Sequence, residues 1–297
     1  MSVPTPVPVP GPAARAAAPW PLLCGTGVLV AAHVLFATYL AGTLGLSIDE
    51  AFSLNTTGGS LSHAFHQSLR FELQPPAYFL VLWFWRRLGS SIFWARLLSI
   101  VFSGATVLAL PSVSRRYLPA LHPLWPTAIV AFNPFLIWAA VEIRCYALVA
   151  LVATWLMIVF FDAFLADASA RPRRAWAAFV LCAVSGLLVQ YYVGFLLLGQ
   201  GVAVLGTRDR AKVLRVALAG LVIAALAAPL APTIVAQVRS HAGEDPHAAG
   251  LVRGVSFLYW HVGEFLVPGL ALAGTSAALA RDWLLRGAVV CAAAGAL

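Results

Sequence analysis

The sequence has few charged residues for its length of 297. Only 10% are Asp, Glu, Lys or Arg, while 61% are apolar. A soluble domain carries about a quarter charged residues, so this composition excludes a chain that faces water on all sides. Most of the chain must face lipid or other apolar segments. Because only helices and closed barrels satisfy their backbone in lipid, we predict an all-α, polytopic transmembrane helical bundle.

Lysine is nearly absent, and the net charge of +8 comes from arginine. The basic residues form clusters between apolar runs and no continuous stripe, so we predict no nucleic-acid partner. Such clusters mark the cytoplasmic ends of membrane helices. This predicts a multi-pass protein of the cell (inner) membrane, in contact with membrane lipids, with its other polar loops on the extracytoplasmic side. The clusters are Arg115/Arg116, Arg171/Arg173/Arg174 and Arg208/Arg210/Lys212/Arg215.

Cysteine is scarce as well, and each of the four lies in or beside an apolar run. None has the spacing of a metal site, and none lies in a loop that a disulfide would close. We therefore predict that they are small packing residues. They are Cys24, Cys145, Cys182 and Cys291.

Proline divides the chain into two regions. Residues 1–21 hold too much proline for a helix and are predicted to form a disordered tail. Residues 22–297 are predicted to form one transmembrane domain, and its apolar ending suggests a form shortened at the C-terminus. The apolar runs are 22–46, 75–85, 92–111, 124–141, 147–165, 176–205, 213–238 and a final one that follows the polar loop 239–253 and extends to 297.

Two of these runs do not have the length of a single crossing. Run 75–85 is too short, so the orientation above requires it to be an interfacial or re-entrant helix. If it did cross, as Arg86 and Arg87 would favour, the sidedness of everything after it would change. Run 176–205 is too long, and we predict two helices with Gln190, Tyr191 and Tyr192 at the bend.

Polar side chains are few and therefore informative. Asp49 and Glu50 follow the first apolar run, where a carboxylate is suited to take a proton from an acceptor hydroxyl or amine. The alternative is that both acids cap a helix beginning at Ala51. Gln74 precedes two prolines that open a helix, which by itself indicates only a helix start.

A second group of charges stands between two later apolar runs. Arg144 is suited to bind an anionic phosphate, because a guanidinium forms paired hydrogen bonds to phosphate oxygens. A structural pair between Glu142 and Arg144 is the alternative, and Arg96 raises the same question. His63 and His66 have a spacing that one helix face could present to a metal, but no third ligand is evident, which favours a surface role.

The order of these short motifs is more specific than any one of them. Asp-Glu follows the first helix, then come Pro-Pro-aromatic, Arg-Leu-Leu-Ser, Asn-Pro-Phe and Glu-x-Arg-x-Tyr-Ala-Leu. This succession resembles the GT-C glycosyltransferases. It is most similar to the bacterial branch of the dolichyl-phosphate-mannose–protein mannosyltransferase family, which includes lipid A aminoarabinose transferases and rhizobial core transferases. The resemblance covers roughly residues 22–240.

The resemblance implies a GT-C-like fold with short interfacial helices in the first outer loop. It also implies transfer of a sugar from a polyprenyl-phosphate donor to a lipid, glycan or protein acceptor outside the membrane. It assigns catalysis to Asp49 and Glu50, and the donor phosphate to Arg144 and Arg96. Substrate contacts fall on Gln74, Glu142, Tyr146, Gln190 and Tyr191. Where many relatives have His or Lys, this chain has Gln74 and Gln190.

The expected chemistry agrees with these residues. A carboxylate takes the acceptor proton, for which Asp49 is the candidate, and fixed positive charge stabilises the leaving phosphate. The sequence assigns no cofactor; a divalent metal at Asp49 could assist by neutralising the phosphate, although no complete ligand set is evident. Two other classes remain open: a transporter or flippase for a lipid-linked substrate, suggested by Glu142 and Arg144, and a non-catalytic GT-C-like subunit, suggested by Gln74 and Gln190.

Overall fold

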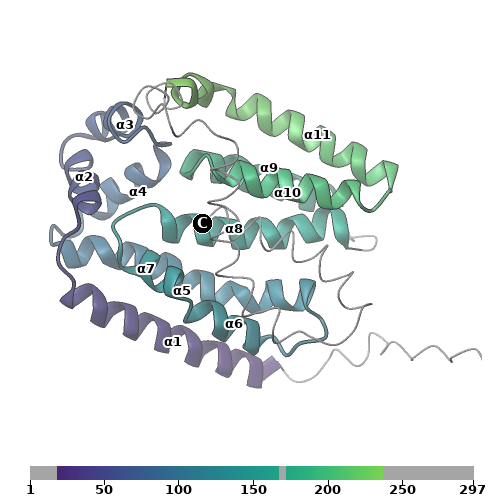
Figure 1. Cartoon of the computed structure of the whole chain (residues 1–297), viewed down its shortest axis with the longest axis horizontal. Helices are drawn as coiled ribbons and strands as arrows, with labels where there is room; N and C mark the ends of the chain where they lie inside the picture. The colour runs from purple at the N-terminus through teal and green to yellow at the C-terminus, as the bar shows by residue number, and fades with distance from the viewer. Residues whose placement is uncertain (1–18, 167–171, 237–297) are drawn as a thin grey trace, which may run out of the picture.

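The computed structural model describes residues 19–166 and 172–236, and every regular element in these ranges is a helix (Figure 1). The predicted all-α class is confirmed. The elements are α1 (Pro19–Thr43), α2 (Ile48–Thr56), α3 (Leu61–Arg70), α4 (Ala77–Trp85), α5 (Ile92–Tyr117), α6 (Leu124–Ala131), α7 (Pro134–Val141), α8 (Tyr146–Phe160), the π-helix η2 (Phe161–Leu165), α9 (Pro172–Val189), α10 (Val193–Leu205), α11 (Arg210–Ala227) and the 3₁₀-helix η3 (Ala228–Leu230).

Within residues 19–166 and 172–236, four helices are long and apolar enough to cross a membrane, and α6 with α7 would be a fifth if the two count as one bent span. The four are Trp20–Thr43, Ile92–Tyr117, Tyr146–Leu165 and Arg210–Ala236. The predicted tail falls outside the described residues up to position 18, while 19–21 already belong to α1. The loop 239–253, the final apolar run and Cys291 also lie outside the described residues.

Helix α8 is the centre of the bundle and packs against α5, α7, α9 and α10. Large side chains fill the space around it, and Leu156, Phe160 and Phe164 are almost fully buried. On the far side of α5, α1 approaches closely because α5 has a glycine there. A Cβ at Gly104 would lie 3.0 Å from Val34. Such small residues allow membrane helices to approach each other.

The chain between α1 and α5 leaves the bundle and returns to the same end. Arg96, in the first turns of α5, donates hydrogen bonds to the carbonyls of Ala41 and Gly45 at the end of α1. Helix α4 has nine residues, which is about 14 Å and half of a bilayer core. The helix is as short as the run length predicted, and its interfacial or re-entrant placement stays a prediction.

Paired tryptophans fix the return of the chain from α4 into α5. The indole of Trp85 donates to the carbonyl of Trp94, and that of Trp94 donates to the carbonyl of Trp85. Their rings stack with centroids 4.8 Å apart. This double contact holds the start of α5 against the short helices.

The run 124–141 is not one straight helix. It breaks between α6 and α7 with a 55° bend. Asn133 caps α7 by accepting from the Phe135 amide, and Pro134 occupies its first position. The ring of His33 on α1 bonds to the Ala131 carbonyl at the end of α6 and to the Ser103 hydroxyl on α5. A backbone carbonyl exposed by the break is thereby satisfied inside the bundle.

The predicted bend in run 176–205 is confirmed. Helix α9 ends at Val189 and α10 begins at Val193, with Gln190, Tyr191 and Tyr192 between them. Two predicted boundaries were wrong. Helix α5 continues through Pro111 to Tyr117, and α9 begins at Pro172 instead of 176.

The connections between helices thus gather at two ends of the bundle. One end, called the site end below, carries the connections α1–α2, α7–α8 and α9–α10 (left in Figure 1). The opposite end carries the basic clusters that were predicted from the sequence, apart from Arg171, which lies outside the described residues. There Arg116 forms a bidentate pair with Asp162 of η2, and Trp176 of α9 donates to the Arg215 carbonyl of α11.

Candidate functional site

Helix α2 contributes a capped start and two sets of side chains to the site end. Its start is a capping box, in which the Ser47 hydroxyl accepts from the Glu50 amide and the Glu50 carboxylate accepts from the Ser47 amide. Glu50 points into the bundle, whereas Asp49 and Ser53, four residues apart, lie toward Arg144. The predicted capping role of the acids is confirmed for Glu50, although the helix begins at Ile48 and not at Ala51.

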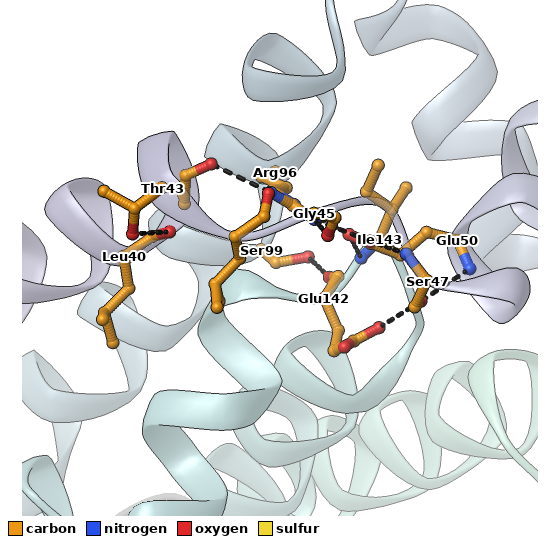
Figure 2. Close-up of polar contacts among 11 residues, drawn as sticks. Leu40, Thr43, Gly45, Ser47, Glu50, Arg96, Ser99, Glu142 and Ile143 are labelled. Atoms are coloured by element: carbon orange, nitrogen blue, oxygen red, sulfur yellow. Dashed lines mark hydrogen bonds and ion pairs between the residues drawn. The ribbon is translucent and has the colours of Figure 1, made fainter.

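Glu50 and Arg96 form a closed ion pair between α2 and α5 (Figure 2). Arg96 Nε and Nη2 donate to Glu50 Oε1 and Oε2 at 2.8 and 2.7 Å, and their side chains are 3% and 1% exposed. The remaining N–H groups of Arg96 bond to the carbonyls of Ala41, Leu44 and Gly45. All five donors of the guanidinium are used within the chain.

The Glu50 carboxylate is equally well satisfied. Besides Arg96 it accepts from the backbone amides of Ser47, at 2.9 Å, and Ile143, at 3.2 Å. Burial by itself would raise the pKa of Glu50, but these hydrogen bonds outweigh it and hold the pKa below its ordinary value. The pair joins α5 to the connections α1–α2 and α7–α8 and has no donor left for a phosphate, so the geometry supports a structural role for Glu50 and Arg96.

Arg144 forms a second ion pair of a different kind. Its Nη1 donates to Glu72 Oε2 at 2.7 Å and to the Ser53 hydroxyl at 3.3 Å. Its Nη2 lies 3.7 Å from Asp49 Oδ2. Glu72 is 3% exposed but Asp49 is 57% exposed. One edge of the guanidinium is therefore fixed by a buried carboxylate, while the other side chains that it meets are Asp49, which is exposed, and Tyr146.

Glu142 does not pair with Arg144, so the alternative of a structural Glu142–Arg144 pair was wrong. Its carboxylate Oε2 accepts from the Ser47 hydroxyl at 3.3 Å, and its backbone carbonyl accepts from Ser99 at 2.6 Å. Figure 2 shows the side chain reaching toward Ser47, beside Glu50. Burial, and then the negative charge of Glu50, raise the pKa of Glu142.

Gln74 and Gln190 meet across a cysteine. The Cys145 thiol donates to Gln74 Oε1 at 3.7 Å and accepts from Gln190 Nε2 at 3.6 Å. Burial raises the pKa of Cys145 to about 11, so the thiol keeps the proton that it donates. The interpretation of Cys145 as an apolar packing residue was therefore incomplete, because it links the connections α3–α4, α7–α8 and α9–α10.

The tyrosines of the site end have polar groups with few partners. The hydroxyls of Tyr78 and Tyr191 are buried, and neither has a hydrogen-bond partner among the described residues. Burial raises the pKa of Tyr191 to about 12. Tyr146, which opens α8, packs its ring against Trp138 with centroids 4.8 Å apart. Both predicted tyrosines, Tyr146 and Tyr191, thus lie at this end.

Glu72 is the site residue that sequence reasoning missed. It stands two positions before Gln74 in a polar stretch, where nothing in the sequence distinguishes it from its neighbours. The structure makes it the main partner of Arg144, and Thr56 donates to its other oxygen at 2.9 Å. The following residue, Leu73, has a φ of 52°, a strained conformation for a bulky side chain of the kind found at functional sites.

The predicted surface role of the histidines agrees with the structure, since His63 and His66 are exposed on α3. In the described ranges no group of three or more His, Cys, Asp or Glu side chains is placed to hold a metal ion. A divalent cation at Asp49 remains a prediction.

The site end therefore combines the buried Glu50–Arg96 pair, the Arg144 guanidinium between buried Glu72 and exposed Asp49, the Glu142 carboxylate, and the amides of Gln74 and Gln190. In comparisons with known proteins, no family model, curated protein or solved structure matches the chain.

Proposed function

We propose that the chain is a GT-C-like integral membrane glycosyltransferase. It transfers a sugar from a polyprenyl-phosphate donor to a lipid, glycan or protein acceptor. The single observation that carries this proposal is Arg144, which buried Glu72 holds at one edge while its Nη2 lies 3.7 Å from the exposed carboxylate of Asp49. A second carboxylate, that of Glu142, lies at the same end of the bundle. Positive charge fixed at one edge and open at the other is suited to a phosphate that leaves as an anion.

The two carboxylates supply the other half of the reaction. Transfer to a hydroxyl or amine requires a base for the acceptor proton, and a carboxylate within reach can act as one. The neutral amides of Gln74 and Gln190 lie beside Arg144, joined through Cys145, and are suited to bind sugar hydroxyls. Arg96 and Glu50 hold the connections that carry these groups.

The position of the site also supports a lipid-borne donor. The site lies at the end of membrane-length helices, so the polyprenyl chain would remain in lipid while its phosphate reaches Arg144. The opposite end carries the basic residues Arg115, Arg116, Arg173, Arg174 and those of α11. By the positive-inside bias that end is cytoplasmic, which puts the site on the extracytoplasmic side of the cell membrane.

A transporter or flippase for a lipid-linked substrate is the second candidate. The broken pair α6–α7, with its 55° bend, favours it, because discontinuous helices are frequent at transport sites. It predicts movement of the substrate across vesicles without chemical change.

The experiment is transfer by the purified protein in lipid with a panel of radiolabelled polyprenyl-phosphate sugars. The variant is Arg144→Gln, and the matched control is Arg115→Gln, an exposed arginine at the opposite end. We expect wild type and control to move label to an acceptor or water, and Arg144→Gln to lose this activity. Equal transfer by all three overturns the proposed site, and uptake of unchanged substrate supports the transporter. No turnover of any donor by a folded wild type supports the non-catalytic subunit.

A further inference from the structure

Asp49 and Glu142, the two carboxylates named in the proposed function, lie at opposite ends of helices. Asp49 is in the first turn of α2, where the positive end of the helix dipole stabilises an anion. The guanidinium of Arg144, 3.7 Å away, stabilises it further.

Glu142 has the reverse arrangement. It is the C-cap of α7, where the negative end of the helix dipole disfavours an anion. No Lys, Arg or His nitrogen in the described part of the chain lies within ion-pair distance of its carboxylate. The charged groups that face it are Glu50 and Asp49 on α2, which disfavour its ionisation, and Arg96 on α5, which favours it.

The hydrogen bonds around Glu142 leave one oxygen available. Oε2 accepts from the Ser47 hydroxyl, which itself accepts from the Glu50 amide and is thereby oriented. Oε1 accepts no hydrogen bond from any described residue, and it is not among the buried unpaired atoms. A half-buried carboxylate held by one oxygen and open at the other has the geometry of a proton acceptor.

We propose that Glu142, and not Asp49, is the general base that takes the proton from the acceptor. This inference rests on the proposed function. In the step, the acceptor O–H or N–H gives its proton to Glu142 Oε1. The acceptor atom forms a bond to the anomeric carbon, and the bond from that carbon to the phosphate oxygen breaks. The electron pair leaves with the polyprenyl phosphate, whose charge Arg144 stabilises.

The division follows a general pattern. A carboxylate whose surroundings raise its affinity for a proton is suited to act in proton transfer. The raised pKa of Glu142, caused first by burial and next by Glu50, agrees with the geometric argument. Asp49 is left to orient Arg144 and to contact the sugar.

The test measures kcat and kcat/KM of sugar transfer against pH for wild type, Glu142→Gln, Glu142→Asp and Asp49→Asn. In wild type, kcat/KM rises with pH as Glu142 ionises, and this acid limb lies above the ordinary range of glutamate. We expect Glu142→Gln to lower kcat about 100- to 10,000-fold, with the KM for the donor nearly unchanged and the acid limb gone. Glu142→Asp keeps the limb at lower kcat.

Asp49→Asn serves as the matched carboxylate variant and retains the acid limb. The proposal is overturned if Glu142→Gln keeps the wild-type kcat and limb, or if the limb disappears in Asp49→Asn instead. An unchanged donor KM also shows that Glu142→Gln is folded.

A second measurement separates this proposal from the proposed function. Difference infrared titration of wild type against Glu142→Gln follows the carboxyl group of Glu142 whether or not transfer occurs. We expect it to titrate above the ordinary range of glutamate. A titration at or below that range overturns the base assignment even where transfer is found. Absence of transfer by wild type with every donor overturns the proposed function, and the base assignment with it.

Discussion

Two arginines at one end of the bundle meet carboxylates in different ways. The side chains of Arg96 and Glu50 are 3% and 1% exposed, and they form their hydrogen bonds with groups of the same chain. Arg144 is held by buried Glu72 on one side but faces Asp49, which is 57% exposed, on the other. The same pair of residue types thus makes a closed scaffold in one place and a partly exposed cluster, our proposed phosphate site, in the other, and the exposure of the carboxylates distinguishes them.

Breaking the closed pair is expected to have the largest effect on stability. Glu50→Gln leaves the Arg96 charge buried without a counterion, so we expect a loss of about 3–5 kcal/mol in the free energy of unfolding. Denaturant titration in detergent measures this. Glu142→Gln, which removes a carboxylate without a cationic partner, is the control. A loss below about 1 kcal/mol in Glu50→Gln would contradict the scaffold role.

Double-mutant cycles sharpen the comparison within the open cluster. We expect a coupling of about 1.5–3 kcal/mol between Glu72 and Arg144, since this charge-assisted bond of 2.7 Å is buried. Between Asp49 and Arg144 it is expected to be below about 1 kcal/mol, because Asp49 is exposed to solvent. The cycles use Gln and Asn variants and the free energy of unfolding. Equal couplings would remove the distinction between the two sides of Arg144.

The smallest effects are those of pH on stability, and they have opposite signs. The folded-state pKa of Glu50 is lowered, so its contribution is full above its ordinary value of 4.5 and is lost as pH falls through the lower folded value. The pKa of Glu142 is raised, so its ionisation costs stability as pH rises above 4.5 through the folded value. Glu142→Gln is thus expected to be slightly more stable than wild type at pH 7, and equal to it at pH 4. Denaturant titrations at the two pH values check this, and a lower stability of Glu142→Gln at pH 7 would contradict it.

Much of the helix pattern could be predicted from apolar run lengths. The bend at Gln190 and the short α4 follow from length alone, because one run is too long and the other too short to cross once. The break at Asn133-Pro134 was missed, because the segments on both sides are apolar and their combined length equals that of one membrane crossing. Helix α5 runs through Pro111, where interhelical packing overrides the local preference.

The site could be predicted only as a set of rare polar residues. Their partners depend on contacts between segments far apart in the sequence, such as Arg144 with Glu72, 72 positions away. Sequence spacing favoured Glu142 as the partner of Arg144, but Arg144 pairs with Glu72 and Asp49, while the Glu142 carboxylate accepts from Ser47. The hydrogen bonds that use all the donors of Arg96 also depend on distant segments, so they could not be predicted from the sequence either.

The most direct test of the open-site account is binding of a sugar-free polyprenyl phosphate to the purified protein. Wild type is compared with Arg144→Gln, with the double variant Arg144→Gln/Glu72→Gln, which leaves no buried charge unpaired, and with Arg115→Gln as control. Loss of charged hydrogen bonds predicts a Kd about 10- to 150-fold higher in both Arg144 variants, with the control unchanged. An unchanged Kd in the folded double variant would contradict a phosphate site at Arg144.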